Sequence, residues 1–404
     1  MGRKRKGDFA VGGEDFLFEE DSGGEERTEA MERAKKTLEE AFEQIDARQI
    51  DKQLIAERLK RTVVADRGQQ PFARIASSLD GKRFELKQTL RSDHRCHPLT
   101  GCLLHSEALY TADKSGRVIR WTVNADDGLF RKQHVFRAPG AVCAMAVVGS
   151  TLFCGLTSGK LYAVDTKTHQ TNAIDQTSGH RMAITGMAIT NDMLYTVSAD
   201  RTVKQWAIDQ QAYLDTLFGH QDEVMGVCAV PGDQTRLVSV GSRDRSLRLW
   251  KVDEESQLVF RLPEADPSGS LDAVAVVSTG DDSFVVATGS DSGSISLWSL
   301  GRKRPIATCA HAHTASISFL YAVKSSDLLI SGSNGDGFVR FWQVDGKSIT
   351  CVQELAVPGC IVAGVMDKTA DDYTLILAVS SEPRLGRWDA DKSLKPSILV
   401  FKLE

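Results

Sequence analysis

The chain has 404 residues, of which 42% are apolar, and this is enough for one large domain with appended segments. Its net charge of −5 excludes a protein that is basic overall, so any nucleic-acid binding must come from a local patch of cations. No apolar run approaches the roughly 20 residues of a membrane span, and the scattered cysteines favour buried, reduced thiols in a reducing compartment.

The first segment, residues 1–25, is expected to be a disordered tail. It opens with GRKRK, in which Arg3, Lys4, Arg5 and Lys6 form a candidate nuclear import signal. Ordinary solvated charge is the alternative interpretation of this run. The tail continues with the acidic stretch EDFLFEEDSGGEE at 14–26, which has too few apolar side chains to form a core.

Residues 26–66 are predicted to form one long charged helix, because they contain no proline or glycine and many alanine, glutamate, lysine and arginine residues. Met31, Leu38 and Phe42 belong to a thin apolar stripe with a spacing of three and four residues. Such a stripe needs a partner or the surface of a domain. The sequence GQQP at 68–71 ends the helical pattern, and residues 67–82 are expected to be a linker.

Residues 83–404 show a repeat with a period in the forties. Tryptophans stand at 121, 206, 250, 298, 342 and 388, so the intervals are 44 to 48 residues except the first, which is 85. Halving that interval aligns SGKLYAV (158–164) with SGRVIRW (115–121) and places Val164 in a tryptophan position. Four short strands per repeat and seven repeats predict an all-β, seven-bladed WD-repeat β-propeller.

Within the repeats, an aspartate lies six residues before the tryptophan, and a histidine lies about 30 residues before it. The aspartate closes a tight turn, the histidine bonds the aspartate, and a strand hydroxyl joins the histidine to the indole N–H. The predicted structural members are His180, Thr196, Asp200, Trp206, His220, Asp244 and Trp250. Because these pairs recur in blade after blade, we expect no catalytic role for them.

Some blades depart from this pattern. His94 is expected to be the loop histidine of the first blade, and its neighbours Cys96, His97, Cys102 and His105 match no standard zinc spacing, so no metal is expected. Ser292 replaces the turn aspartate of the fifth blade, and the fifth and seventh blades lack a Gly-His pair. Val164 replaces the tryptophan of the second blade, and we expect the second, fifth and seventh blades to be held by packing alone.

Arginines flank the turn aspartates at positions where most WD repeats carry glycine or another small residue. The stretch SRDRSLRLW (242–250) supplies Arg243 and Arg245, and the preceding repeat supplies Arg201. The loops that lead into the blades open on the same face and add Arg181 and Gln221. These side chains are predicted to form an arc that contacts phosphates, unless they are solvated or paired with Asp222 and Glu223.

Four stretches resemble the WD-repeat proteins specific to the U3 box C/D small nucleolar ribonucleoprotein: TLFGHQD (216–222), EESQLVF (254–260), GRKRPIA (301–307) and RLGRW (384–388). The resemblance implies a non-enzymatic protein of the nucleus and nucleolus that needs no cofactor, no membrane and no small-molecule substrate. It also implies binding to the box B/C region of U3 RNA with the kink-turn-binding protein. The other small-subunit processome proteins are further implied partners, in pre-rRNA processing and small ribosomal subunit biogenesis.

A propeller that reads peptides, such as the substrate receptor of a ubiquitin ligase, is the alternative from another functional class. That interpretation expects an apolar or aromatic patch at the centre of the face instead of an arginine arc.

Two segments compete for the last strand of the ring, RFELKQTL (83–90) and SILVFKL (397–403). We favour RFELKQTL as the outer strand of the seventh blade and SILVFKL as its third strand. The residues between the second and third strands then form a long turn on the arginine-bearing face. Arg384, Arg387 and Trp388 lie in that turn, where they can contact RNA or a protein partner.

Overall fold

The computed structural model describes residues 72–79, 81–91, 97–106, 108–124, 127–174, 177–190, 193–231, 235–263, 267–280, 283–368, 373–386, 391 and 393–403. The predicted tail (1–25) with Arg3, Lys4, Arg5 and Lys6, and the predicted helix (26–66), lie outside these residues. So do His94 and Cys96. Within the described part of the chain, no helix is long and apolar enough to cross a membrane.

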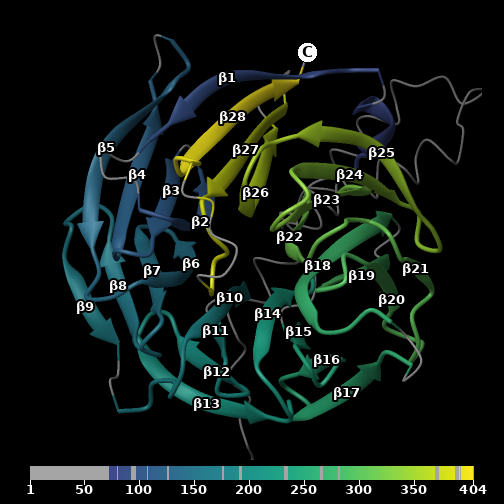
Figure 1. Ribbon diagram of the computed structural model, residues 1–404. Helices are drawn as coiled ribbons and strands as arrows, with labels where there is room; N and C mark the ends of the chain where they lie inside the picture. The colour runs from purple at the N-terminus through teal and green to yellow at the C-terminus, as the bar shows by residue number, and fades with distance from the viewer. Residues whose placement is uncertain are drawn as a thin grey trace, which may run out of the picture. The chain divides into compact units, whose positions relative to one another are not determined.

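The described residues form 28 strands in seven antiparallel sheets of four, arranged in a ring (Figure 1). Residues from the first strands of all seven sheets line one central cavity, which we call the channel. The predicted seven-bladed propeller is confirmed. Blades 1 to 3 consist of β2 (Leu99–His105), β3 (Ala108–Asp113), β4 (Arg117–Val123), β5 (Phe130–Arg137); β6 (Val142–Val148), β7 (Thr151–Leu156), β8 (Leu161–Asp165), β9 (Thr171–Ile174); β10 (Ile184–Thr190), β11 (Met193–Ser198), β12 (Thr202–Ala207), β13 (Ala212–Phe218).

Blades 4 to 6 follow in chain order with the same arrangement, the first strand of each lining the channel. They consist of β14 (Val224–Ala229), β15 (Arg236–Gly241), β16 (Ser246–Lys251), β17 (Ser256–Arg261); β18 (Leu271–Gly280), β19 (Ser283–Ser290), β20 (Ile295–Ser299), β21 (Ala307–Cys309); β22 (Ile317–Ala322), β23 (Leu328–Ser333), β24 (Phe338–Val344), β25 (Ile349–Ala356).

The seventh blade joins both ends of the repeat region. Its strands are β26 (Cys360–Lys368), β27 (Tyr373–Ser380), β28 (Ser397–Leu403) and β1 (Phe84–Leu90), hydrogen-bonded in that order. Phe84 pairs with Leu403 and Leu90 with Ile398, so the N-terminal strand covers the outer edge of the C-terminal one (Figure 1). The favoured closure is therefore confirmed, and it protects an edge that would otherwise be open for pairing.

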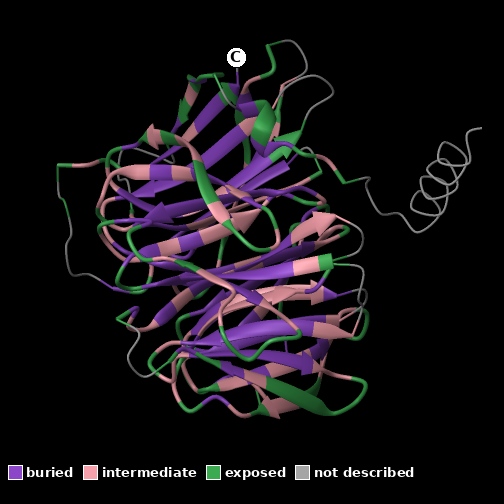
Figure 2. Cartoon of the chain, turned by 90° about the vertical axis from the view of Figure 1, so that its right-hand side faces the viewer, coloured by how far each residue is buried: buried purple, intermediate pink, exposed green. Residues whose placement is uncertain are grey.

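The core lies between neighbouring blades. The middle strands are buried along most of their length, and the exposed residues gather on outer strands and loops (Figure 2). Trp206 of blade 3 packs with Phe153 and Leu161 of blade 2 in one apolar cluster. Val164, in the tryptophan position of blade 2, is 3% exposed and lies in an apolar cluster with residues of blade 1. A smaller apolar side chain therefore keeps the packing between these two neighbouring blades.

A short segment before the first strand packs against blade 6. Ala73 forms a parallel bridge with Ser326, and the 3₁₀ helix η1 (Ala76–Leu79) follows it. The carboxylate of Asp327 accepts hydrogen bonds from the backbone N–H groups of Ile75 and Ala76, at 2.9 and 3.1 Å. Leu79 is fully buried in the apolar cluster of blades 6 and 7. Part of the segment 67–82, expected to be a linker, therefore contributes to the core.

Candidate nucleic-acid interface

The turn of blade 3 is held by a chain of buried hydrogen bonds. The indole N–H of Trp206 donates to the hydroxyl of Thr196 at 2.9 Å, and that hydroxyl lies 2.8 Å from Nε2 of His180. Nδ1 of His180 lies 2.9 Å from the carboxylate of Asp200. If the hydroxyl donates to Nε2 and Nδ1–H donates to the carboxylate, every donor has an acceptor. The predicted network of this blade is present in full.

Blade 4 repeats this chain with a serine in place of the threonine. Trp250 donates to Ser239 at 2.8 Å, Ser239 lies 2.7 Å from Nε2 of His220, and Nδ1 of His220 lies 2.8 Å from Asp244. Burial acts to raise the pKa of Asp244, but the hydrogen bond and charge of His220, with further backbone N–H donors, hold it at about 2. Asp244 and Trp250 therefore serve the fold.

The same aspartates fix the loops that lead into the blades. The backbone N–H of Arg181 donates to Asp200 at 3.0 Å, and that of Gln221 donates to Asp244 at 3.1 Å. Both side chains are exposed. We call the surface formed by turns 199–201 and 242–245 and loops 179–183 and 219–223 the turn face. It is a rigid surface, because its backbone is bonded into the buried networks.

Two arginines on the turn face have a backbone conformation that favours glycine. The residue after the turn aspartate, or after its equivalent, has a positive φ in blades 1 to 6. Four of these positions are glycines, with φ between 73° and 84°: Gly116, Gly159, Gly293 and Gly337. The other two are Arg201, at 71°, and Arg245, at 53°. A non-glycine residue in this region costs about 1–2 kcal/mol, so two turns carry a guanidinium group in spite of backbone strain.

The predicted arc is only partly assembled. Arg181, Arg201, Gln221 and Arg243 are exposed on the turn face. In the described part of the chain no salt bridge involves Arg201 or Arg243, so pairing with Asp222 or Glu223 does not occupy them. Arg245 is half-buried, and its Nη2 donates to the carbonyl of Pro263 at 3.2 Å. The arc therefore spans the two turns of blades 3 and 4 and the loops beside them, with Arg245 partly engaged in the fold.

The described start of the connection between β27 and β28, residues 381–386, is bonded to blade 1. Nζ of Lys114, from the turn of blade 1, bonds the carboxylate of Glu382 and the carbonyls of Pro383 and Gly386, at 2.6, 2.8 and 2.6 Å. These four bonded groups are largely buried. A single lysine from another blade therefore anchors the start of this connection.

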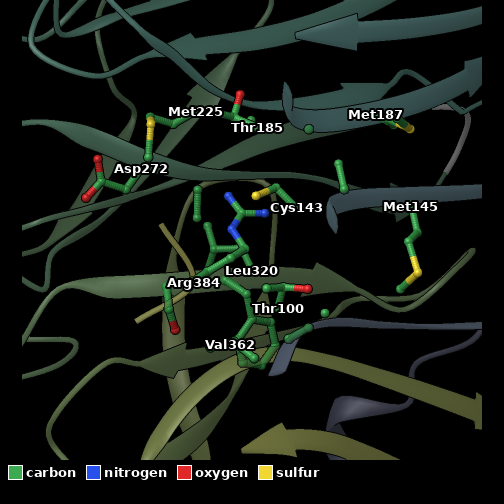
Figure 3. A pocket seen from close by; sticks show the side chains of 18 of the residues that line it. Thr100, Cys143, Met145, Thr185, Met187, Met225, Asp272, Leu320, Val362 and Arg384 are labelled. Carbon is green, nitrogen blue, oxygen red and sulfur yellow. The ribbon is translucent and has the colours of Figure 1, made fainter. Parts of the chain in front are cut away.

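Arg384 lies inside the channel mouth, with Asp272 and Cys143 among the residues that line the same cavity of about 290 Å³ (Figure 3). Burial raises the pKa of Asp272 to about 6, against the opposing charge of Arg384. Arg384 is thus directed into the channel and does not extend the arc. Arg387 and Trp388 lie outside the described residues.

Sequence reasoning missed a third complete network, in blade 6. His313 contacts Asp336 and Ser331, each at 2.6 Å, and the indole of Trp342 donates to Ser331 at 2.8 Å. The signal was the 29-residue interval from His313 to Trp342, hidden because alanine, not glycine, precedes the histidine.

The expectation that blade 5 holds by packing alone is wrong. Ser292, in the aspartate position, donates to the carbonyl of Ser268 at 3.2 Å and lies 3.0 Å from the hydroxyl of Ser290. The indole of Trp298 donates to Thr288 at 2.9 Å. Hydroxyl groups therefore replace the carboxylate and the imidazole in closing this turn.

Comparison with known proteins gives one family profile and several relatives. The profile described as WD domain, G-beta repeat, matches residues 172–207, 211–251 and 303–343. An uncharacterized WD repeat-containing protein of Schizosaccharomyces pombe is 30% identical over 89% of this chain and 79% of its own length.

Two further relatives carry functional names. U3 small nucleolar RNA-interacting protein 2 of Mus musculus is 29% identical over 89% of this chain and 78% of its own length. Ribosomal RNA-processing protein 9 of Saccharomyces cerevisiae is 28% identical over 50% of this chain and 46% of its own length. Among solved structures, that of U3-55K superposes with a TM-score of 0.67 at 30% identity, over 78% of this chain and 97% of that one.

Proposed function

Since this chain belongs to the family of WD-repeat propellers that includes the U3 small nucleolar RNA-interacting proteins, we propose that it is a non-catalytic RNA-binding scaffold of the U3 small nucleolar ribonucleoprotein. In this role it acts in ribosomal RNA processing, in the nucleus and nucleolus. The name of the mouse relative supports the assignment to the U3 particle, and the name of the yeast relative supports the role in ribosomal RNA processing.

The observation that carries the proposal is the pair of strained arginines on the turn face. Arg201 and Arg245 occupy positions where four other blades carry glycine. Packing does not require the side chain of Arg201, which is exposed and makes no salt bridge in the described part of the chain. A guanidinium group bonds phosphate through parallel N–H donors. With Arg181, Gln221 and Arg243 beside them, these side chains form a basic surface on a chain whose net charge is −5.

The resemblance also supports a finer proposal about the partners. The turn face contacts the backbone of the box B/C region while the kink-turn-binding protein is seated on the same RNA. Arg387 and Trp388 come next in the sequence after residues 382–386, and we propose that they contact the RNA or this protein. Arg384 lines the channel cavity, so we do not assign it to this contact.

RNA recovery from nuclear extract tests the proposal. The full chain is used as bait, and the bound RNA is sequenced. U3 RNA is expected to be enriched with the wild-type chain and depleted with Arg243→Ala. Arg131→Ala is the matched control, because Arg131 is an exposed arginine at the opposite end of its blade from the turns. Recovery of peptides or proteins without RNA would contradict the proposal and favour the peptide-reading alternative.

A further inference from the structure

A groove of about 630 Å³ opens on the turn face between blades 3 and 4. Its lining includes Arg181, Arg201, Lys204 and Phe218. Phe218 ends the outer strand β13, opposite Thr202. Phe218 belongs to neither of the apolar clusters that flank blade 3.

Phe218 is 71% exposed, whereas Met182 and Leu86, the next most exposed large apolar residues in the described part of the chain, are 50% and 49% exposed. An aromatic ring so far in solvent contributes little to folding. Its backbone carbonyl accepts a bond from Gln257 at 3.4 Å, which ties the strand end to blade 4 and limits its movement. The ring is therefore an available flat surface at a fixed place.

The charges around the ring select the kind of ligand. Arg181 and Arg201 are cationic and exposed, whereas Lys204, which also lines the groove, donates to the carbonyl of Ser178 at 2.7 Å. Asp200 is the carboxylate in the same groove. Asp200 is already bonded by His180, by the N–H of Arg181 and by Thr202. Burial acts to raise its pKa, but those donors hold the pKa well below its usual range, so it stays ionised and occupied. The charge left to meet a ligand is positive.

A ligand that presents a flat aromatic face and a negative charge together fits this groove, and an unpaired nucleotide does so. We infer that the groove is a subsite for one unpaired nucleotide of the bound RNA, whose base stacks on Phe218 and whose phosphate lies between Arg181 and Arg201. This inference rests on the proposed function and adds a stacking contact to it.

Four variants separate stacking from other contacts. Phe218→Ala and Phe218→Leu are expected to weaken the binding of U3 RNA by about tenfold or more, because both remove the aromatic face. Phe218→Trp is expected to bind within about twofold of wild type, because it keeps that face. Leu214→Ala is the matched control, since Leu214 is an exposed apolar residue of the same strand outside the groove. All four should melt within a degree or two of wild type.

Phe218→Trp also gives a direct signal, because an exposed indole on a stacking surface is quenched by a nucleobase. A single-stranded uridine decamer is expected to quench the fluorescence of the new tryptophan. The same decamer paired in a duplex is expected to leave this fluorescence unchanged.

The possible failures are distinct. If RNA binding depends on Arg243 but Phe218→Ala and Phe218→Leu bind normally, the stacking inference is wrong and the proposed function stands. If Phe218→Leu keeps binding that Phe218→Ala loses, the groove holds an apolar group, such as a peptide side chain, and stacking is again excluded. If the wild-type chain binds no RNA, the proposed function fails and the inference fails with it.

Discussion

Replacing Arg201 by glycine is expected to stabilise the fold while it weakens RNA binding. The φ of 71° at this position costs a non-glycine residue about 1–2 kcal/mol, and glycine removes that strain. Glycine also loses about 0.5–1 kcal/mol more conformational entropy on folding. The balance for Arg201→Gly is a gain of about 0–1.5 kcal/mol in the free energy of unfolding.

The same change at Arg245 has a different balance. The side chain of Arg245 donates a hydrogen bond to the carbonyl of Pro263, which is worth about 0.5–1.5 kcal/mol. Arg245→Gly is therefore expected to leave the free energy of unfolding nearly unchanged or to lower it slightly. Arg201→Ala retains the strain and removes the guanidinium group, so it should be neutral or slightly destabilising and should bind RNA as weakly as Arg201→Gly.

Urea denaturation measures the free energy of unfolding of these variants, and the salt dependence of RNA affinity measures their phosphate contacts. For each lost phosphate contact, the slope of log affinity against log salt should become shallower by about 0.7–0.9. If Arg201→Gly destabilises the chain by more than about 1 kcal/mol, the strain argument is wrong. If both variants at position 201 leave the affinity and the slope unchanged, the outward role of this arginine is wrong.

Three further predictions concern the fold around the interface. Asp244→Ala should lower the free energy of unfolding by about 1–3 kcal/mol, because it leaves the buried His220 unsatisfied, whereas Arg243→Ala should leave the melting temperature within a degree or two; equal losses in both variants would contradict these roles. A chain that starts at residue 70 should melt like the full chain, and one that starts at residue 81 should lose several kcal/mol because Leu79 and its neighbours are buried; identical unfolding curves would refute that contribution. Because the pKa of Asp272 is raised to about 6 by burial, the folded state binds more protons than the unfolded state between about pH 4 and 6, so stability relative to Asp272→Asn should fall as pH rises through that window; a difference that is constant with pH would contradict it.

The sequence was sufficient for the repeat and its closure because both depend on local patterns. The tryptophan interval located the blades, and Val164 could be aligned because the small residues before it match those before Trp121. RFELKQTL was recognisable as an outer strand because it is followed directly by a loop into the first blade, as the pairing of β1 with β28 bears out.

The parts that could not be predicted depend on contacts between distant residues. Asp327 caps the backbone at Ile75 across more than 250 residues, and no local signal marks either partner. Arg384 could be placed in a long connection, but its direction is set by Lys114 of another blade. The sequence shows an arginine where other blades carry glycine, but the positive φ of Arg201 is seen only in the structure.

The most direct test of the central claim measures the affinity of the full chain for U3 RNA and for an unrelated structured RNA of equal length, with the wild type and with Arg201→Gly/Arg243→Ala. We predict preferential binding of U3 RNA by the wild type. The double variant should bind at least tenfold more weakly, with a salt slope that is shallower by about 1.4–1.8. Its free energy of unfolding should be unchanged or higher by up to about 1.5 kcal/mol, because glycine relieves the strain at position 201. Equal affinity of wild type and double variant for U3 RNA, with the same salt slope, would contradict the claim that the turn face binds the RNA.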